Sequence, residues 1–130
     1  MTTRRSLTTV LALCGLVTAQ SAIGIEAQES VADERTISEG KALYASVGLC
    51  FACHGPTGQG VPGAGPNLSD GDWLHSDGSL DGIFTRILTG VSPSESKSGV
   101  IMPPKGGSAI TEEQARSIAA YVWSLQRRTF

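Results

Sequence analysis

Long apolar runs, clustered positive charge and cysteine are all scarce in this chain of 130 residues. The formal net charge is −2, which does not favour a nucleic-acid partner. There is no internal repeat, heptad run or strong charge block, so neither a repeat protein nor a coiled coil is indicated. With 40% hydrophobic residues, the sequence predicts one small globular domain, and a bulky cofactor could form much of its core.

The one apolar run covers residues 7–17, follows two arginines and precedes a stretch of small residues. It is shorter than the roughly 20 residues that a helix needs to cross a bilayer. The pattern therefore predicts a signal peptide over residues 1–27, with a retained membrane anchor as the alternative. Cleavage after Ala27 fits the pattern, and Ala19 is the competing site. We expect an exported, periplasmic protein with no membrane span after the signal is removed.

The next segment, residues 28–35, is polar with little to bury and predicts a flexible leader. Thr36 and Glu39 have the spacing of a capping box. A helix is therefore expected from Thr36 to about Val47, with Gly48 as its stop.

Two further helices follow from apolar spacing and capping residues. Ser79 is expected to cap a short helix that ends at Gly90. Thr111 and Gln114 form a second capping-box pattern, and an apolar stripe continues from there to about Arg127. No segment gives a convincing strand pattern.

The segments between these helices, residues 55–65 and 91–107, are rich in glycine and proline. Long loops without regular structure count against a small compact fold unless something orders them. A central cofactor would do so.

Cysteine chemistry is confined to one place in the mature chain. Removal of the signal peptide takes Cys14 away and leaves only Cys50 and Cys53, followed directly by His54. Cys-x-x-Cys-His is the signature of covalent haem attachment, in which two thiols bond to the porphyrin and the histidine binds iron. The alternatives are a thioredoxin-like redox pair, a plain disulfide, or a zinc site completed by the distant His75. The helical pattern and the export signal favour one covalent haem c.

A second axial ligand decides whether a haem protein transfers electrons or reacts with bound molecules. Met102 is the only methionine besides the initiator, and it lies in an irregular loop before two prolines. We predict that Met102 binds iron opposite His54, which raises the reduction potential and fills the site. The alternatives are that Met102 is an ordinary core residue or that His75 is the second ligand.

The chain resembles a class I monohaem cytochrome c from about Gly40 to Leu125. The resemblance rests on an ordered set of motifs: the attachment motif, Gly65-Pro66-Asn67-Leu68, Met102-Pro103 and Ala119-Ala120-Tyr121-Val122. Within that family, Gly71-Asp72-Trp73-Leu74-His75 is similar to cytochrome c domains of bacterial cbb-type oxidases and of dehydrogenase cytochrome subunits.

The resemblance implies an all-α class I cytochrome c fold over residues 36–130, with three main helices and long loops wrapped around one haem. It assigns Cys50 and Cys53 to the thioether bonds, His54 to the proximal ligand and Met102 to the distal ligand.

The same resemblance implies supporting roles. Pro66 matches the proline whose carbonyl accepts a hydrogen bond from the proximal histidine, and Leu68 belongs to the same matched motif. Gly40 and Tyr44 match residues where the first and last helices cross, close to Ile118 and Tyr121 in the last helix.

Two further residues are candidates for binding the haem propionates. Trp73 and Arg86 carry N–H groups that suit carboxylates. The alternatives are that Trp73 only packs against the ring and that Arg86 lies on a solvated helix face.

These features predict a single-electron carrier, not an enzyme, that shuttles electrons between a dehydrogenase or quinol-oxidising complex and a terminal acceptor. Redox proteins are the expected partners: a dehydrogenase, an oxidase or another cytochrome. The alternatives are a haem c subunit of a periplasmic dehydrogenase complex and a peroxidase or gas-binding haem protein. Lys97 and Lys105 bracket Met102, so a salt-sensitive positive patch beside the haem edge is a further hypothesis.

Overall fold

The computed structural model describes residues 32–128, so the predicted signal peptide lies outside the described residues. Within this range the chain forms α-helices, short 3-10 helices and two isolated bridges, without a strand, which confirms the all-α prediction. None of these helices has the length and apolar character needed to span a membrane. The elements in order are α1 (Glu34–Tyr44), α2 (Cys50–His54), α3 (Leu80–Thr89), η1 (Pro104–Gly107), α4 (Glu112–Leu125) and η2 (Gln126–Arg128).

The start of α1 differs from the prediction. The helix begins at Glu34, and its N-cap is Asp33, whose carboxylate accepts the Thr36 backbone N–H at 2.7 Å. The predicted cap at Thr36 is therefore wrong. The physical reason is that an aspartate at the N-cap both accepts a hydrogen bond and favours the positive end of the helix dipole.

The end of α1 is also earlier than predicted. The helix stops at Tyr44, and residues 45–48 form turns that lead into the attachment motif. Gly48 is buried in this turn, donating its N–H to the Leu43 carbonyl at 2.9 Å. A Cβ there would be 2.8 Å from the Leu43 carbonyl oxygen and from Ile118 Cδ1, so the turn needs glycine to close this tightly beside α4.

The caps of the other two main helices are confirmed. The Ser79 hydroxyl accepts the Gly82 N–H at 2.9 Å at the start of α3. Thr111 and Gln114 form the reciprocal capping box of α4, with hydrogen bonds of 2.9 and 3.2 Å. Helix α4 ends at Leu125, and a 3-10 turn rather than α-helix continues from there.

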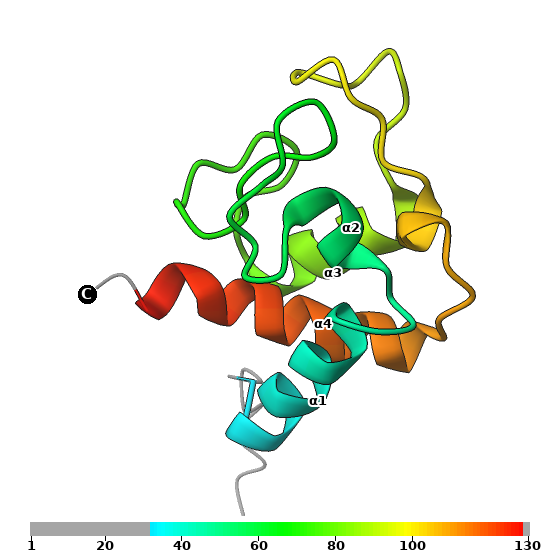
Figure 1. The fold of residues 1–130 in the computed structure, drawn as a ribbon. Helices are drawn as coiled ribbons and strands as arrows, with labels where there is room; N and C mark the ends of the chain where they lie inside the picture. Colours follow the sequence, from blue (N-terminus) through cyan, green and yellow to red (C-terminus); the bar gives the residue numbers. More distant parts are fainter. Residues whose placement is uncertain (1–31, 129–130) are drawn as a thin grey trace, which may run out of the picture.

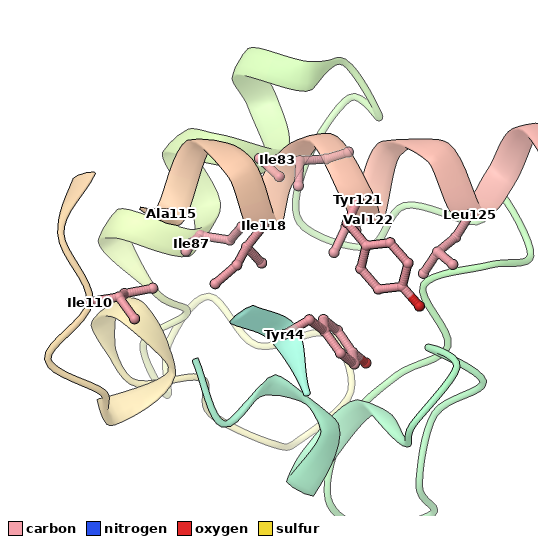
Figure 2. Close-up of a cluster of buried hydrophobic side chains, with 10 residues drawn as sticks. Tyr44, Ile83, Ile87, Ile110, Ala115, Ile118, Tyr121, Val122 and Leu125 are labelled. Atoms are coloured by element: carbon pink, nitrogen blue, oxygen red, sulfur yellow. The ribbon is translucent and has the colours of Figure 1, made fainter. Parts of the chain in front are cut away.

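The core lies where α4 packs against α1 and α3. At the α1–α4 crossing, a Cβ on Gly40 would overlap the Ser117 carbonyl oxygen, so only glycine permits this approach. The rings of Tyr44 and Tyr121 meet edge to face, with centroids 5.2 Å apart (Figure 2). In Figure 1, α1 lies below α4, whereas the loops after α2 and after α3 lie above it. The fold thus places its long loops together on the side of α4 away from α1.

Candidate functional site

An open cavity with about 1070 Å³ of empty space lies among these loops. This volume includes space that is open to solvent. Apolar side chains of the core, among them Ile83, Ile87, Ile118 and Val122, form part of its lining. Every site residue predicted from the sequence also lines it: Cys50, Cys53, His54, Pro66, Leu68, Trp73 and Met102.

The attachment motif forms α2, a single helical turn that the sequence did not predict. Its N-cap, Leu49, has a left-handed backbone, with φ 56°, which turns the chain sharply into the motif. Helical geometry places Cys50 and Cys53 on the same face, three residues apart. Both thiols are free, and burial raises the pKa of Cys50 to about 11. The pair is therefore presented together at the cavity.

The imidazole of His54 is oriented by a main-chain group. Its Nδ1 lies 2.8 Å from the Pro66 carbonyl oxygen, which can only accept, so Nδ1 carries the proton. The lone pair is then on Nε2, the nitrogen that a metal could bind. Burial lowers the pKa of His54, and the hydrogen bond to Pro66 acts in the opposite direction. The contact that the resemblance implied between these two residues is present.

Main-chain hydrogen bonds between residues on either side of Pro66 hold its loop in place. Gly60 donates its N–H to the His54 carbonyl at 2.7 Å, and Leu68 donates to the Gly58 carbonyl at 2.7 Å. Gly60 has φ +81°, and a Cβ there would be 2.7 Å from the Asn67 nitrogen. The loop after the motif therefore closes back on His54 through glycine-dependent turns.

The main chain of Met102 is fixed by an isolated antiparallel bridge. Val91 donates to the Met102 carbonyl at 2.7 Å, and Met102 donates to the Val91 carbonyl at 3.1 Å. Gly90, with φ +69°, ends α3 and lies against Met102 and the two prolines that follow, where a Cβ would collide with their backbone. The end of α3 thus positions the methionine loop.

Trp73 and Arg86 line the cavity but give their N–H groups to protein partners. The Trp73 indole donates to Gln126 Oε1 at 3.0 Å. Arg86 donates through Nε to the His75 carbonyl at 2.7 Å and through an amino group to the Gly90 carbonyl at 2.8 Å. Arg86 therefore does not lie on a solvated helix face, since its guanidinium joins two loops to α3.

His75 also lines the cavity, and its Nε2 accepts a long hydrogen bond, 3.4 Å, from the Lys97 backbone. Its pKa is lowered by partial burial and by the charges of Arg86 and Lys97, while Glu95 raises it. Within residues 32–128 no three His, Cys, Asp or Glu side chains gather in a metal-ligating cluster, so the zinc set considered above is not formed there.

The two lysines that bracket Met102 differ in exposure, since Lys97 is exposed and Lys105 is partly buried. Lys105 donates its ammonium to the Ile110 carbonyl at 2.9 Å and is partly buried, so it contributes less to a positive patch than its sequence position indicated. By contrast, four large apolar side chains are exposed: Val47, Leu49, Phe51 and Ile101.

Comparison with known proteins assigns the family. Residues 35–122 match the family described as cytochrome C oxidase, cbb3-type, subunit III. The chain belongs to this family. It is a cytochrome c domain, and the electron-transport assignment made from its motifs is supported.

Curated relatives of this cytochrome c domain are subunits of cbb3-type oxidases. The subunit CcoP of Rubrivivax gelatinosus is 36% identical over 93 residues, covering 72% of this chain and 27% of the relative. CcoP of Rhodobacter capsulatus is 37% identical over 98 residues, with 72% and 31% covered. FixPc of Rhizobium leguminosarum bv. viciae is 38% identical over 77 residues, with 58% and 26% covered. The cytochrome c domain thus spans less than a third of the length of these relatives.

Solved structures agree on the fold of the domain. Cytochrome cL of Methylophaga aminisulfidivorans has a TM-score of 0.56 at 24% identity, covering 74% of this chain and 57% of that chain. A reducing HAO-like protein complex of Kuenenia stuttgartiensis has a TM-score of 0.53 at 22% identity, with 72% and 44% covered. The cytochrome c-like fold is therefore confirmed.

Sequence reasoning missed one contributor to the site of the cytochrome c domain. Gln126 lies 53 residues from Trp73 and belongs to no motif, so no local signal marks it. By contrast, the glycines at 60 and 90 could have been noted as candidates for left-handed backbone beside the two predicted iron ligands.

Proposed function

We propose that the mature chain is a periplasmic single-electron carrier with one haem c, bound through thioether bonds to Cys50 and Cys53. The observation that carries this proposal is the His54 imidazole, fixed by Pro66 in a cavity that both cysteines and Met102 also line. The donor set fits the group, because two free thiols, a histidine with its Nε2 lone pair available and a thioether meet one apolar cavity.

Each residue has a defined part in this proposal. His54 and Met102 would hold the iron, and the bound haem would supply a metal that alternates between its ferrous and ferric forms. A thioether opposite histidine favours the ferrous form and so raises the reduction potential. The Pro66 carbonyl keeps the imidazole in one orientation and increases its basicity.

The protein would keep this coordination unchanged while the electron moves. The Val91–Met102 bridge fixes the methionine backbone, and the main-chain bonds around Gly60 fix the histidine side. Apolar core side chains form part of the cavity lining and would limit contact of the bound group with water. A fixed geometry requires little rearrangement on electron transfer, which supports a carrier over a peroxidase or gas-binding protein, because those need an open iron position.

A haem c subunit within a larger periplasmic oxidoreductase is the second candidate function. It is favoured by the exposed apolar side chains near the motif and the methionine, with Leu49 48% and Ile101 54% exposed. Both residues also line the cavity, so another redox protein could pack directly beside the haem edge. In either case the expected partners are a dehydrogenase, an oxidase or another cytochrome.

Spectroscopy of protein matured in a bacterial periplasm tests the proposal. The haem should stay with the chain on denaturation in acid acetone, and its attachment should be lost in the Cys50→Ser, Cys53→Ser double variant. The ferric protein should show a near-infrared sulfur-to-iron band that is absent from Met102→Ala and present in the control His75→Ala. A band unchanged in Met102→Ala would overturn the distal assignment. Co-purification of a stoichiometric dehydrogenase or oxidase would favour the second candidate.

A further inference from the structure

Trp73 lies in a stretch without helix or strand, yet it forms part of the cavity lining. Two neighbours fix its indole. The ring N–H donates to Gln126 Oε1 at 3.0 Å, and Gly78 lies so close that a Cβ there would be 2.5 Å from Nε1. The position of this aromatic side chain is therefore determined by residues outside its own turn.

Gln126 binds this stretch at two points. Its Oε1 accepts from Trp73, and its Nε2 donates to the Gly78 carbonyl at 3.0 Å. The two bonds fix the orientation of the amide, because a flipped amide would set donor against donor and acceptor against acceptor. Gln126 directly follows the last residue of α4, so the end of the longest helix is tied to the loop that borders the cavity.

We propose that Gln126 is a positioning residue that holds Trp73 against the cofactor and keeps water out at this side of the cavity. The inference rests on the proposed haem site, and it assigns the Trp73 N–H to Gln126 rather than to a haem propionate.

Loss of the Gln126 bonds should change the reduction potential of the iron by admitting solvent. A loosened Trp73 admits water, and water stabilises the more highly charged ferric state. Solvent exposure is one of the factors that set haem potentials. The reduction potential should therefore fall although neither axial ligand has been touched.

The test compares Gln126→Leu, which removes both bonds, with Gln126→Glu, which keeps an acceptor for the indole and loses the donor to Gly78. In the ferrous holoprotein, exchange of the Trp73 indole proton with solvent is measured by NMR, with the resonance assigned by its absence from Trp73→Phe. Gln126→Leu should speed this exchange by about fivefold, the factor that corresponds to one ordinary hydrogen bond. Gln126→Glu should exchange more slowly than Gln126→Leu, because its carboxylate can still accept from the indole.

The reduction potential supplies the second readout. Gln126→Leu should shift it downward in wild type but not in a Trp73→Phe background, because the effect runs through the indole contact. Arg127→Gln, next to Gln126 and stacked over the Trp123 ring, is the matched control and should change neither measurement.

The outcomes separate this inference from the proposed function. Absence of covalent haem from the wild-type protein would overturn the proposed function, whereas the indole exchange, then measured in the haem-free chain, would still report on the bond between Trp73 and Gln126. A holoprotein with His/Met ligation in which Gln126→Leu changes neither exchange nor potential would overturn the inference. An equal shift of potential in the wild-type and Trp73→Phe backgrounds would also overturn it, since Gln126 would then act by another route.

Discussion

Two segments that border the same cavity are stabilised in different ways. The motif segment, residues 49–68, is held mainly by its own backbone, as in the bonds from Gly60 to His54 and from Leu68 to Gly58. The loop segment, residues 69–79 and 90–103 on either side of α3, has the main-chain bridge between Val91 and Met102 but is also tied down by two side chains, Arg86 of α3 and Gln126 after α4.

This difference teaches where each segment is vulnerable. Main-chain bonds remain when side chains change, so the motif segment should fail at glycines, where an added Cβ strikes backbone. Side-chain ties disappear with a single substitution, so the loop segment should fail at the residues that make them. Four predictions, ordered by expected effect, examine this contrast.

The largest effect is expected from Gly60→Ala in the motif segment. The new Cβ would meet the Asn67 backbone at a left-handed φ, so the free energy of unfolding should fall by about 3 kcal/mol. Gly63→Ala is the matched control, because Gly63 has a similar φ, +77°, with nothing within 4 Å of the added atom. The control should cost only about 1 kcal/mol of backbone strain. Guanidinium denaturation of both proteins measures the difference, and equal losses would contradict a steric role for Gly60.

The next effect is expected from Arg86→Met, which removes a side chain that ties down the loop segment. Loss of the charged hydrogen bonds to His75 and Gly90 should lower the free energy of unfolding by about 2 kcal/mol. The control, Arg116→Met, loses an exposed ion pair to Asp81 and a contact with the Phe84 ring. It should cost no more than about 1 kcal/mol. Urea denaturation checks both, and a larger loss at Arg116 would break the comparison.

A smaller effect is expected from Tyr44→Phe, which removes a side-chain tie to the motif segment. The Tyr44 hydroxyl donates to the Gly55 carbonyl at 2.8 Å, next to His54. Its loss leaves a buried carbonyl without that partner and should cost about 1.5 kcal/mol. Tyr121→Phe, in which the edge-to-face ring contact is also kept, should be nearly neutral. Thermal unfolding of the two variants distinguishes hydrogen bonding from ring packing; a neutral Tyr44→Phe would show that backbone bonds alone hold the motif segment.

The smallest effect is expected from the pH response of His75. Its pKa is lowered in the folded protein, so the unfolded chain binds a proton first as pH falls. The free energy of unfolding should therefore decrease as pH drops through the ordinary histidine range and on through the lower folded pKa. His75→Gln should flatten this decrease in holoprotein, measured by urea denaturation at pH 7.5 and pH 5. A variant with the wild-type slope would contradict the assignment to His75.

Much of the fold follows from local signals in the sequence. Ser79 and Thr111 mark helix starts because a capping side chain acts within three residues of its own position. The start of α1 was misassigned because Asp33 and Thr36 are both good capping residues, and Asp33 forms the bond. The extra turn over residues 45–48 and the helix over Cys50–His54 depend on packing against α4 and on the left-handed Leu49, which local patterns do not record.

The candidate site likewise contains residues that the sequence predicts and hydrogen-bond partners that it does not. The predicted residues from Cys50 to Met102 all line one cavity. This grouping could be predicted because their motifs occur in a characteristic order along the sequence. The partners of Trp73 and Arg86 could not be predicted, since each bond depends on how a loop without regular structure folds against a helix. The roles of the residues from Cys50 to Met102 in binding haem are predictions for the holoprotein.

The Val91–Met102 bridge has a consequence for how this domain can be altered. The bridge holds both ends of the stretch over residues 92–101. That stretch is therefore a loop with fixed ends, and its length need not affect the position of the methionine. Extending such a loop costs little, since the entropy of closing it grows only slowly with length. Its serine-rich and mostly exposed tip is therefore a natural place to insert a peptide tag or a new recognition sequence without moving the residue proposed to bind the iron.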